Sequence, residues 1–240
     1  MDNGIYITLS KQMGMFRDMD VTATNLANVN TAGYNAEKLM FSDYLVKDQK
    51  RQDAYANDPL SWRDTAQGSL RTTENTFDLA ISGPGYFQIQ TPLGVRYTRS
   101  GNFQINGEGT LVTIEGNPVL GADGGEITIP DNARNTVING AGQVTVDGED
   151  VGQVGVMEFR DEQAMNRLGN SLYSSNETPL PTETSRVVQG AIESSNVAPV
   201  SEMVRVMQLS RSTASTAKFI EVMYDLQRKT SSAYAKQQQA

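Results

Sequence analysis

The chain has 240 residues, of which 38% are hydrophobic, and this is enough to bury at least one core. Its net charge of −8 lies mainly in residues 41–195, which carry 11 basic and 21 acidic side chains, and an acidic middle without clustered Lys and Arg argues against nucleic-acid binding. Cys and His are both absent, which excludes disulfides, thiolate chemistry and the usual zinc ligand sets. We therefore expect no cofactor and no metal site.

An amphipathic helix is predicted near the start of the chain. Apolar residues recur there in alternating steps of four and three, the spacing of a seam along which one helix packs against another. Beyond Leu26 come Asn, Thr and Gly, which weaken a helix interior but cap and turn a chain, so the helix is expected to end near Asn28. The expected seam consists of Ile5, Leu9, Phe16, Met19 and Leu26.

A second helical seam lies near the other end of the sequence. Ser201 is placed to cap this helix, and Glu202 would favour the positive end of its dipole. Because two helices alone leave much of an apolar stripe uncovered, both ends of the chain are predicted to contact further helices. The expected residues of this seam are Val206, Leu209, Ile220, Met223 and Leu226.

Residues 35–75 follow the first helix and the turn after it, and they precede the strand pattern that begins at Thr76. They are predicted to form a linker or an irregular arm. A short amphipathic helix is expected over residues 39–46, after which polar residues dominate. The single tryptophan, Trp62, is expected to anchor the arm, the alternative being an exposed indole.

From Thr76 the apolar period changes from about 3.6 to 2, which predicts short strands. Turn sequences rich in Gly, Asn, Asp and Pro separate them and supply the positive backbone angles that tight connections need. Strands are expected at residues 77–81, 86–90, 95–99, 102–106, 110–114, 126–129, 136–138, 143–146 and 154–159.

The expected fold class is α+β, with N- and C-terminal α-helices pairing as a helical assembly domain and an all-β, mainly antiparallel middle domain. The return to the last helix is predicted to be extended and polar, with Asn, Gly and Pro along it. The expected divisions are residues 1–34 for the first helix, 35–75 for the linker, 76–160 for the β domain, 161–196 for the return linker and 197–240 for the second helix.

Carboxylates are the remaining candidates for catalysis or calcium binding. Asp147, Glu149 and Asp150 form the densest group, but Asp-Gly beside strands is an ordinary hairpin turn, and the spacing of an EF-hand is not met. Gly-Pro-Gly at residues 83–85 lacks the Lys and the Ser or Thr of a phosphate-binding loop. We expect neither enzyme activity nor a small-molecule substrate.

Membrane and export signals are also weak. No run approaches the roughly eighteen apolar residues of a membrane span. The first twenty residues contain charged side chains where a signal peptide has an apolar core. We expect no membrane insertion and no cleavable signal peptide.

Residues 25–34 (NLANVNTAGY), which follow the predicted first helix, resemble the N-terminal signature of bacterial flagellar rod and hook proteins. The opening, residues 1–6 and 9–13, and the modest length are most similar to the proximal-rod members, with distal-rod and hook members as alternatives. Further segments resemble the same family and follow in the family's order. They are residues 67–70 (QGSL), 77–87 (FDLAISGPGYF), 97–103 (YTRSGNF), 190, 193–197 (ESSNV) and 202–203 (EM).

The resemblance implies a structural subunit of the flagellar basal-body rod, whose terminal helices polymerise into the drive shaft that crosses the periplasm. It implies other rod subunits and the flagellar type III export apparatus as partners, and leaves open whether the chain also binds copies of itself. The signature is expected to shape the exit from the first helix through Asn25, Leu26, Ala27, Asn28, Thr31, Gly33 and Tyr34.

Two alternatives belong to other functional classes. One is a secreted β-rich peptidoglycan hydrolase that uses Asp147, Glu149 or Asp150. The other is an adhesin-like binding module, which predicts a monomer with dispensable ends.

Overall fold

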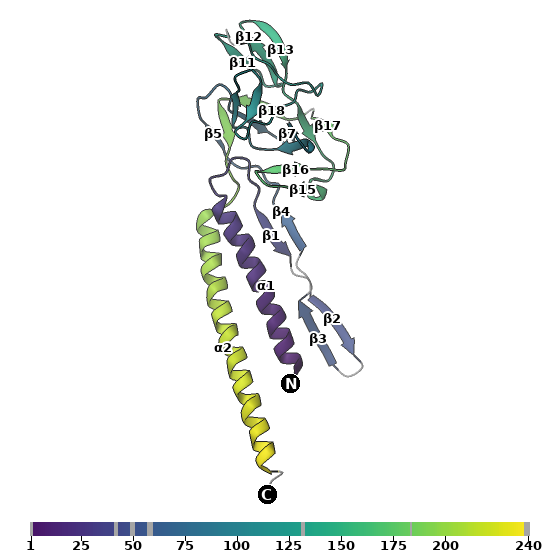
Figure 1. Cartoon of the computed structure of the whole chain (residues 1–240), viewed down its shortest axis with the longest axis vertical. Helices are drawn as coiled ribbons and strands as arrows, with labels where there is room; N and C mark the ends of the chain where they lie inside the picture. The colour runs from purple at the N-terminus through teal and green to yellow at the C-terminus, as the bar shows by residue number, and fades with distance from the viewer. Residues whose placement is uncertain are drawn as a thin grey trace. The chain divides into compact units, whose positions relative to one another are not determined.

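The computed structural model describes residues 2–40, 43–48, 51–56, 60–130, 133–182 and 184–237 (Figure 1). The chain forms two compact units. The first unit comprises Met1–Ala27, Glu37–Trp62 and Ala198–Ala240, and the second comprises Asn28–Ala36 and Arg63–Val197. The chain therefore passes between the units four times.

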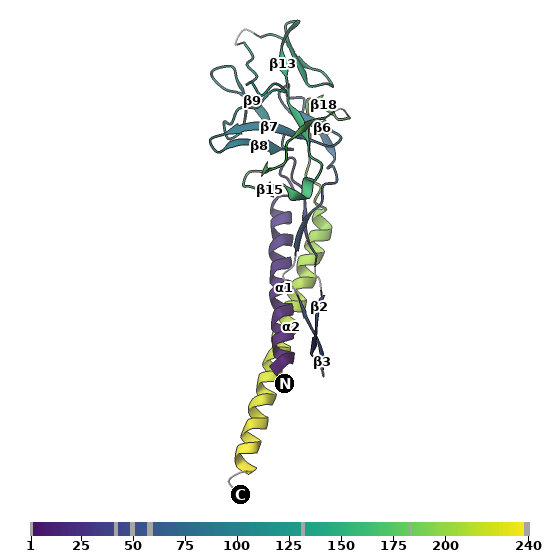
Figure 2. The ribbon, with the colours of Figure 1, turned by 90° about the vertical axis from the view of Figure 1, so that its right-hand side faces the viewer.

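Two long helices dominate the first unit. Helix α1 (Asp2–Ala27) ends one residue before Asn28, as the sequence predicts, and α2 (Pro199–Gln237) begins with proline, which suits a first helical turn because its N–H would have no partner there. The helices lie side by side and run in opposite directions in both views (Figures 1 and 2). Two strand pairs complete this unit: β1 (Glu37–Met40) with β4 (Leu60–Arg63), and β2 (Asp43–Asp48) with β3 (Arg51–Ala56).

The second unit is built from antiparallel strands. Its largest sheet has six strands in the order β15-β16-β8-β7-β14-β17, a second sheet has the order β11-β12-β13, and three strand pairs join β5 to β19, β6 to β18 and β9 to β10. The bounds are β5 (Leu70–Thr72), β6 (Leu79–Ser82), β7 (Tyr86–Thr91), β8 (Gly94–Thr98), β9 (Phe103–Ile105), β10 (Leu111–Thr113), β11 (Thr136–Ile138), β12 (Gln143–Val146), β13 (Glu149–Gln153), β14 (Val156–Glu158), the 3₁₀ turn Glu162–Ala164, β15 (Asn166–Arg167), β16 (Leu172–Ser174), β17 (Leu180–Pro181), β18 (Arg186–Gln189) and β19 (Ala191–Glu193).

Most buried apolar side chains of the second unit lie in two hydrophobic clusters. The larger is mainly aliphatic and includes Leu79, Ile89 and Val144, none of which is exposed. The smaller is mainly aromatic. In it, the Tyr86 ring makes edge-to-face contacts with Phe159 and Tyr173, at centroid distances of 6.1 and 5.7 Å respectively. This unit therefore has a core of its own, supplied by side chains from most of its strands.

The expected fold class is wrong in how it divides helices from strands. The unit that contains α1 and α2 also contains β1 to β4, so it is not a domain made by paired helices, and strands β15 to β19 lie in the stretch expected to be a linker. The two apolar seams are not buried against each other either, since none of their described side chains is fully buried. The reason is that small and polar residues, namely Gly14, Asp18, Thr22 and Asn25, occupy the buried side of α1.

The helix expected over residues 39–46 is also wrong, because residues 37–40 and 43–48 are strands. Over so short a run, apolar residues fit either period, and pairing with other strands decides the conformation. Trp62 lies on β4, 39% exposed, with the Lys38 ammonium 5.4 Å from its ring centroid. The indole is thus neither a core anchor nor free of contacts.

Within the second unit, the expected strands at 136–138 and 143–146 coincide with β11 and β12. The strand expected at 126–129 is reduced to isolated bridges, Thr110 with Thr128 and Leu120 with Glu126. Strand β13, which was not expected, follows a tight turn in which Asp147 and Gly148 both have positive φ.

Candidate functional site

Large apolar side chains are exposed along one side of α1. Leu9, Met13 and Phe16 are 46%, 55% and 47% exposed, and their spacing places them on one face of the helix. Monomeric proteins rarely leave a row of such side chains uncovered unless it serves as a contact surface. This row, which we call the α1 face, includes two of the predicted seam residues.

The remaining seam residues of α1 are less accessible. Met19 and Leu26 are partly buried, and the side chain of Ile5 lies outside the part of the chain that the structure describes. Of the seam predicted from periodicity, Leu9 and Phe16 thus lie on the α1 face, whereas Met19 and Leu26 lie closer to the buried side of the helix.

Helix α2 also exposes large apolar side chains. Leu226 is 56% exposed, whereas Val206, Leu209, Ile220 and Met223 are partly buried. Further accessible apolar residues lie beside this seam, and of these the periodicity missed Phe219 and Val222. These additional exposed side chains are Met203, Met207, Phe219, Val222 and Tyr224.

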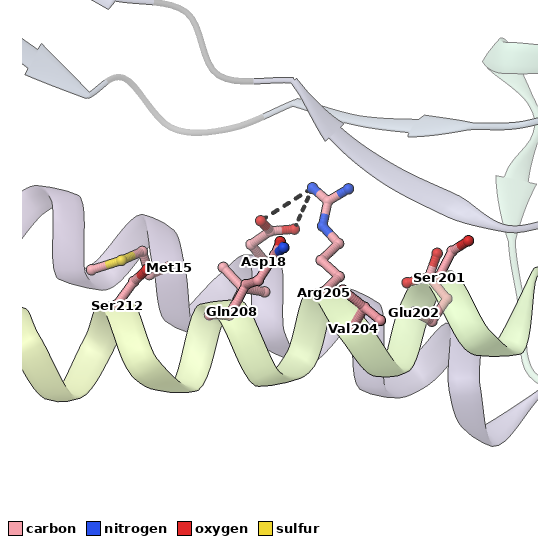
Figure 3. Close-up of a pocket in the computed structure, with 9 residues that line it drawn as sticks. Met15, Asp18, Ser201, Glu202, Val204, Arg205, Gln208 and Ser212 are labelled. Carbon is pink, nitrogen blue, oxygen red and sulfur yellow. Dashed lines mark hydrogen bonds and ion pairs between the residues drawn. The ribbon is translucent and has the colours of Figure 1, made fainter.

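A groove of about 500 Å³ lies between α1 and α2 (Figure 3). On it, Asp18 and Arg205 point toward each other, and the Arg205 Nη2 atom lies 2.9 and 3.1 Å from the two carboxylate oxygens. Because the arginine side chain is well exposed, this ion pair contributes only about 0–1 kcal/mol to stability. The rest of the lining mixes apolar, hydroxyl and charged groups, as helix–helix contacts commonly do.

The signature segment leaves α1 through a short hydrogen-bonded turn. The Thr31 backbone N–H donates to the Asn28 carbonyl at 3.1 Å, and the Thr31 hydroxyl donates to the Asn28 side-chain oxygen at the same distance. Leu26 and Ala27 are the last two helical residues. Asn28 and Thr31 thus form a hydrogen-bonded turn directly after the last helical residue.

Gly33 follows in a conformation that needs glycine. Its φ is +64°, and a Cβ atom there would lie 2.4 Å from the Arg99 carbonyl carbon and from the Ser100 nitrogen. The Gly33 N–H donates to the Glu193 carbonyl at 2.9 Å. The Gly33 backbone therefore packs directly against the loop after β8 and is hydrogen-bonded to the end of β19.

Tyr34 is the anchor that follows, with only 1% of its surface exposed. It packs with Val29, Ala36 and Val197, and the Arg167 guanidinium lies 4.2 Å from its ring centroid. Burial of an aromatic ring under a cation stabilises this end of the second unit.

Asn196, Glu193 and Arg99 stabilise the packing of the signature segment against the rest of the second unit, and sequence reasoning did not single them out. The side-chain oxygen of Asn196 accepts from Ala36 N–H at 2.7 Å, while its amide nitrogen donates to the carbonyls of Asp64 and Ala66 at 2.8 Å each. Buried Glu193 accepts from Gly68 N–H at 3.0 Å and lies 3.5 Å from Arg99 Nε. Their only sequence signal was that they belong to segments resembling the family, because their partners are far away in the chain.

Comparison with known proteins gives matches that include both helices and the β region. The flagellar hook protein FlgE/F/G D1 domain matches residues 80–146, and the C-terminal region of flagellar basal body rod FlgEFG proteins matches residues 188–233. The flagellar basal-body rod protein FlgF of Caulobacter vibrioides is 36% identical over 235 residues, which cover 95% of this chain and 96% of the relative. The chain belongs to the flagellar rod and hook protein family.

Two other family relatives show the same extent of similarity. FlgF of Mesorhizobium japonicum is 36% identical over 90% of this chain and 91% of its own length. The rod protein FlgG of Bacillus subtilis is 31% identical over 90% of this chain and 93% of its own length. The resemblance to the family drawn from the signature is thus confirmed.

In this rod-family chain the carboxylates considered for hydrolysis lie in and beside the β12–β13 turn. The Asp147 side chain accepts from the backbone N–H groups of Arg134 and Asn135 at 3.2 and 3.0 Å, and Asp150 accepts from the Thr145 hydroxyl at 3.3 Å. Asp147 therefore stabilises a turn, and Glu149 is exposed. Among the described residues there is no cluster of acidic side chains that suits a metal ion, and no helix long and apolar enough to cross a membrane.

The buried carboxylate of this rod-family chain predicts a pH effect on stability. Burial raises the pKa of Glu193 above its ordinary 4.5, against the opposing attraction of Arg99. Between pH 4.5 and the raised pKa, the folded chain therefore binds a proton that the unfolded chain has released. The stabilisation that this proton gives the folded chain is complete below pH 4.5 and is lost as the pH rises through the folded pKa. Relative to Glu193→Gln, the wild-type free energy of unfolding should fall with rising pH, by about 1.4 kcal/mol per unit of pKa shift.

Urea unfolding of wild type and Glu193→Gln, followed by circular dichroism from below pH 4.5 upward, measures both free energies of unfolding. A wild-type free energy that rises with pH relative to the variant would mean that the Arg99 attraction outweighs burial, and this would refute the prediction.

Proposed function

We propose that this chain is a structural subunit of the flagellar basal-body rod and that it joins neighbouring subunits through the exposed apolar side chains of α1 and α2. The observation that carries the proposal is the row of half-exposed residues on the α1 face together with Phe219, Val222 and Leu226 on α2. Membership of the rod and hook family supports it. The proposed contact residues are Ile5, Leu9, Phe16, Met19, Leu26, Val206, Leu209, Ile220, Met223 and Leu226.

Burial of these side chains would supply the energy of assembly. Complete burial of a Leu, Ile, Phe or Met side chain is worth roughly 1.5–3 kcal/mol, so a half-exposed one gains about half of that when a neighbour covers it. The α1 and α2 surfaces differ from one another, and contacts between unlike surfaces can propagate along a helical assembly instead of closing into a dimer.

The proposed location is the proximal part of the rod in the periplasm. The FlgF relatives of Caulobacter vibrioides and Mesorhizobium japonicum, each 36% identical over at least 90% of this chain, support the proximal assignment. Other rod subunits are the proposed partners, and the flagellar type III export apparatus is the proposed route of export. In this role the chain acts through interfaces, without catalysis.

The test is complementation of a strain that lacks this gene by a copy carrying an epitope within the exposed Asp147-Gly148 turn. We expect swimming to be restored and the tagged chain to co-purify with basal bodies that have been stripped of hook and filament. Normal rods and normal swimming in the deletion strain would contradict the proposal.

A further inference from the structure

We propose that Asn25 is a positioning residue for the strand pair β1–β4, a role separate from shaping the helix exit. Its side-chain amide nitrogen donates to the Glu37 carbonyl at 2.7 Å, and its side-chain oxygen accepts from the Glu37 N–H at 2.9 Å. Asn25 is itself 2% exposed and lies inside α1, two residues before its end. Its side chain therefore binds the first residue of β1.

The two bonds copy the pairing of neighbouring strands. In an antiparallel ladder one residue exchanges an N–H and a carbonyl with its partner, and the Asn25 amide offers the same donor and acceptor to Glu37. Among side chains of this length, only asparagine carries both groups in this arrangement at every pH. The amide thus pairs with both backbone polar groups of Glu37 on the side of β1 that faces α1.

Strand β1 is partly exposed. Met40 at its end is 59% exposed, and the Lys38 ammonium contacts the partly exposed ring of Trp62 across the strand pair. The described sheet has two strands, and a two-stranded sheet has marginal stability without packing on another element. Loss of the Asn25 amide should therefore loosen β1 far more than an ordinary single hydrogen bond would.

This role divides the signature between the two units. Asn25 binds Glu37 within the first unit, whereas Asn196 binds the preceding residue, Ala36, within the second. Each of these two consecutive residues is held by an asparagine amide. The helix exit itself depends on Asn28 and Thr31, so one short signature carries two separate tasks.

The decisive variant is Asn25→Asp, because an aspartic acid has the donor and acceptor only while it is protonated. The ionised carboxylate cannot donate to the Glu37 carbonyl, and burial beside that carbonyl will keep the variant carboxyl protonated above its usual pH range. At about pH 8 we expect hydrogen-exchange protection of residues 37–40 to fall roughly tenfold or more below wild type. As the pH falls and the carboxyl gains its proton, protection should return to within about twofold of wild type.

Protection factors are compared with wild type at each pH and with residues 86–98 of the same protein. This cancels the titration of the charged residues in the elements packed against α1, which are Glu37 and Lys38 in β1, Arg51 and Asp53 in β3, and Glu202, Arg205, Arg211, Lys218, Glu221, Asp225, Arg228, Lys229 and Lys236 in α2. Asn25→Ala should lose protection equally at every pH. Asn106→Asp is the matched control, because the Asn106 side-chain oxygen accepts from the Glu108 and Thr110 N–H groups, and an aspartate keeps both bonds.

Wild-type protection of residues 37–40 in Asn25→Ala, or a loss in Asn25→Asp that does not change with pH, would overturn the proposal. The measurement uses the purified full-length chain, so it tests the role of Asn25 independently of assembly into a rod.

Discussion

Replacement of Gly33 by alanine is expected to lower the free energy of unfolding of the second unit by roughly 3–5 kcal/mol. A left-handed φ of +64° costs a non-glycine residue about 1–2 kcal/mol. The new Cβ would also lie 2.4 Å from backbone atoms of Arg99 and Ser100, which cannot rotate away as a side chain can. The chain must separate at this point, and the Gly33 to Glu193 hydrogen bond is then lost as well.

Urea unfolding followed by circular dichroism measures the loss, with Gly116→Ala as the matched control. Gly116 also has positive φ, +84°, but a Cβ there meets nothing within 4 Å, so only the conformational cost of about 1–2 kcal/mol remains. Equal losses in the two variants would show that the close approach of Gly33 to the Arg99 backbone has no energetic weight.

The Gly33 junction also shows what sequence reasoning can and cannot reach. The turn at Asn28 and Thr31 is local, and Asn, Thr and Gly in order after a helical repeat are enough to predict it. The reason that position 33 must be glycine is not local, because it depends on a loop more than sixty residues later in the chain. A resemblance can mark such a residue as important, but only the structure gives its physical role.

The same division applies to the strands. β11 and β12 are predicted correctly because Asn- and Gly-rich turns border them directly in the sequence. β18 and β19 are missed because their partners, β6 and β5, lie more than a hundred residues earlier and their own sequences are too short to show a period. Non-local pairing rather than strand propensity forms them.

On α1, periodicity identifies an apolar side but not which side the chain itself covers. The buried side contains Asp18, Thr22 and Asn25, and each has a hydrogen-bonding partner: Arg205, the Asp18 carbonyl and Glu37 respectively. Polar side chains can be buried when their partners are supplied, and two of these partners come from distant segments. The apolar side is consequently left accessible to other molecules.

Phe16→Glu is therefore expected to abolish swimming while leaving the chain folded. Phe16 is 47% exposed on the α1 face, so the substitution removes little that the isolated chain buries. A neighbouring subunit that covers this position would instead have to bury an unpaired carboxylate and would lose the ring contact. Together these effects should cost roughly 3 kcal/mol or more per contact, which is more than a hundredfold in affinity.

The control is Lys11→Glu, which places a carboxylate at an exposed, polar position on the same helix. In a strain that lacks the gene, Lys11→Glu should restore wild-type swimming in soft agar, whereas Phe16→Glu should give no spreading and no rods in purified basal bodies. Both purified chains should keep the wild-type urea midpoint, because neither position is buried. Normal rods containing Phe16→Glu would show that the α1 face takes no part in assembly, and the contacts between subunits would then have to be sought on α2 and on the second unit.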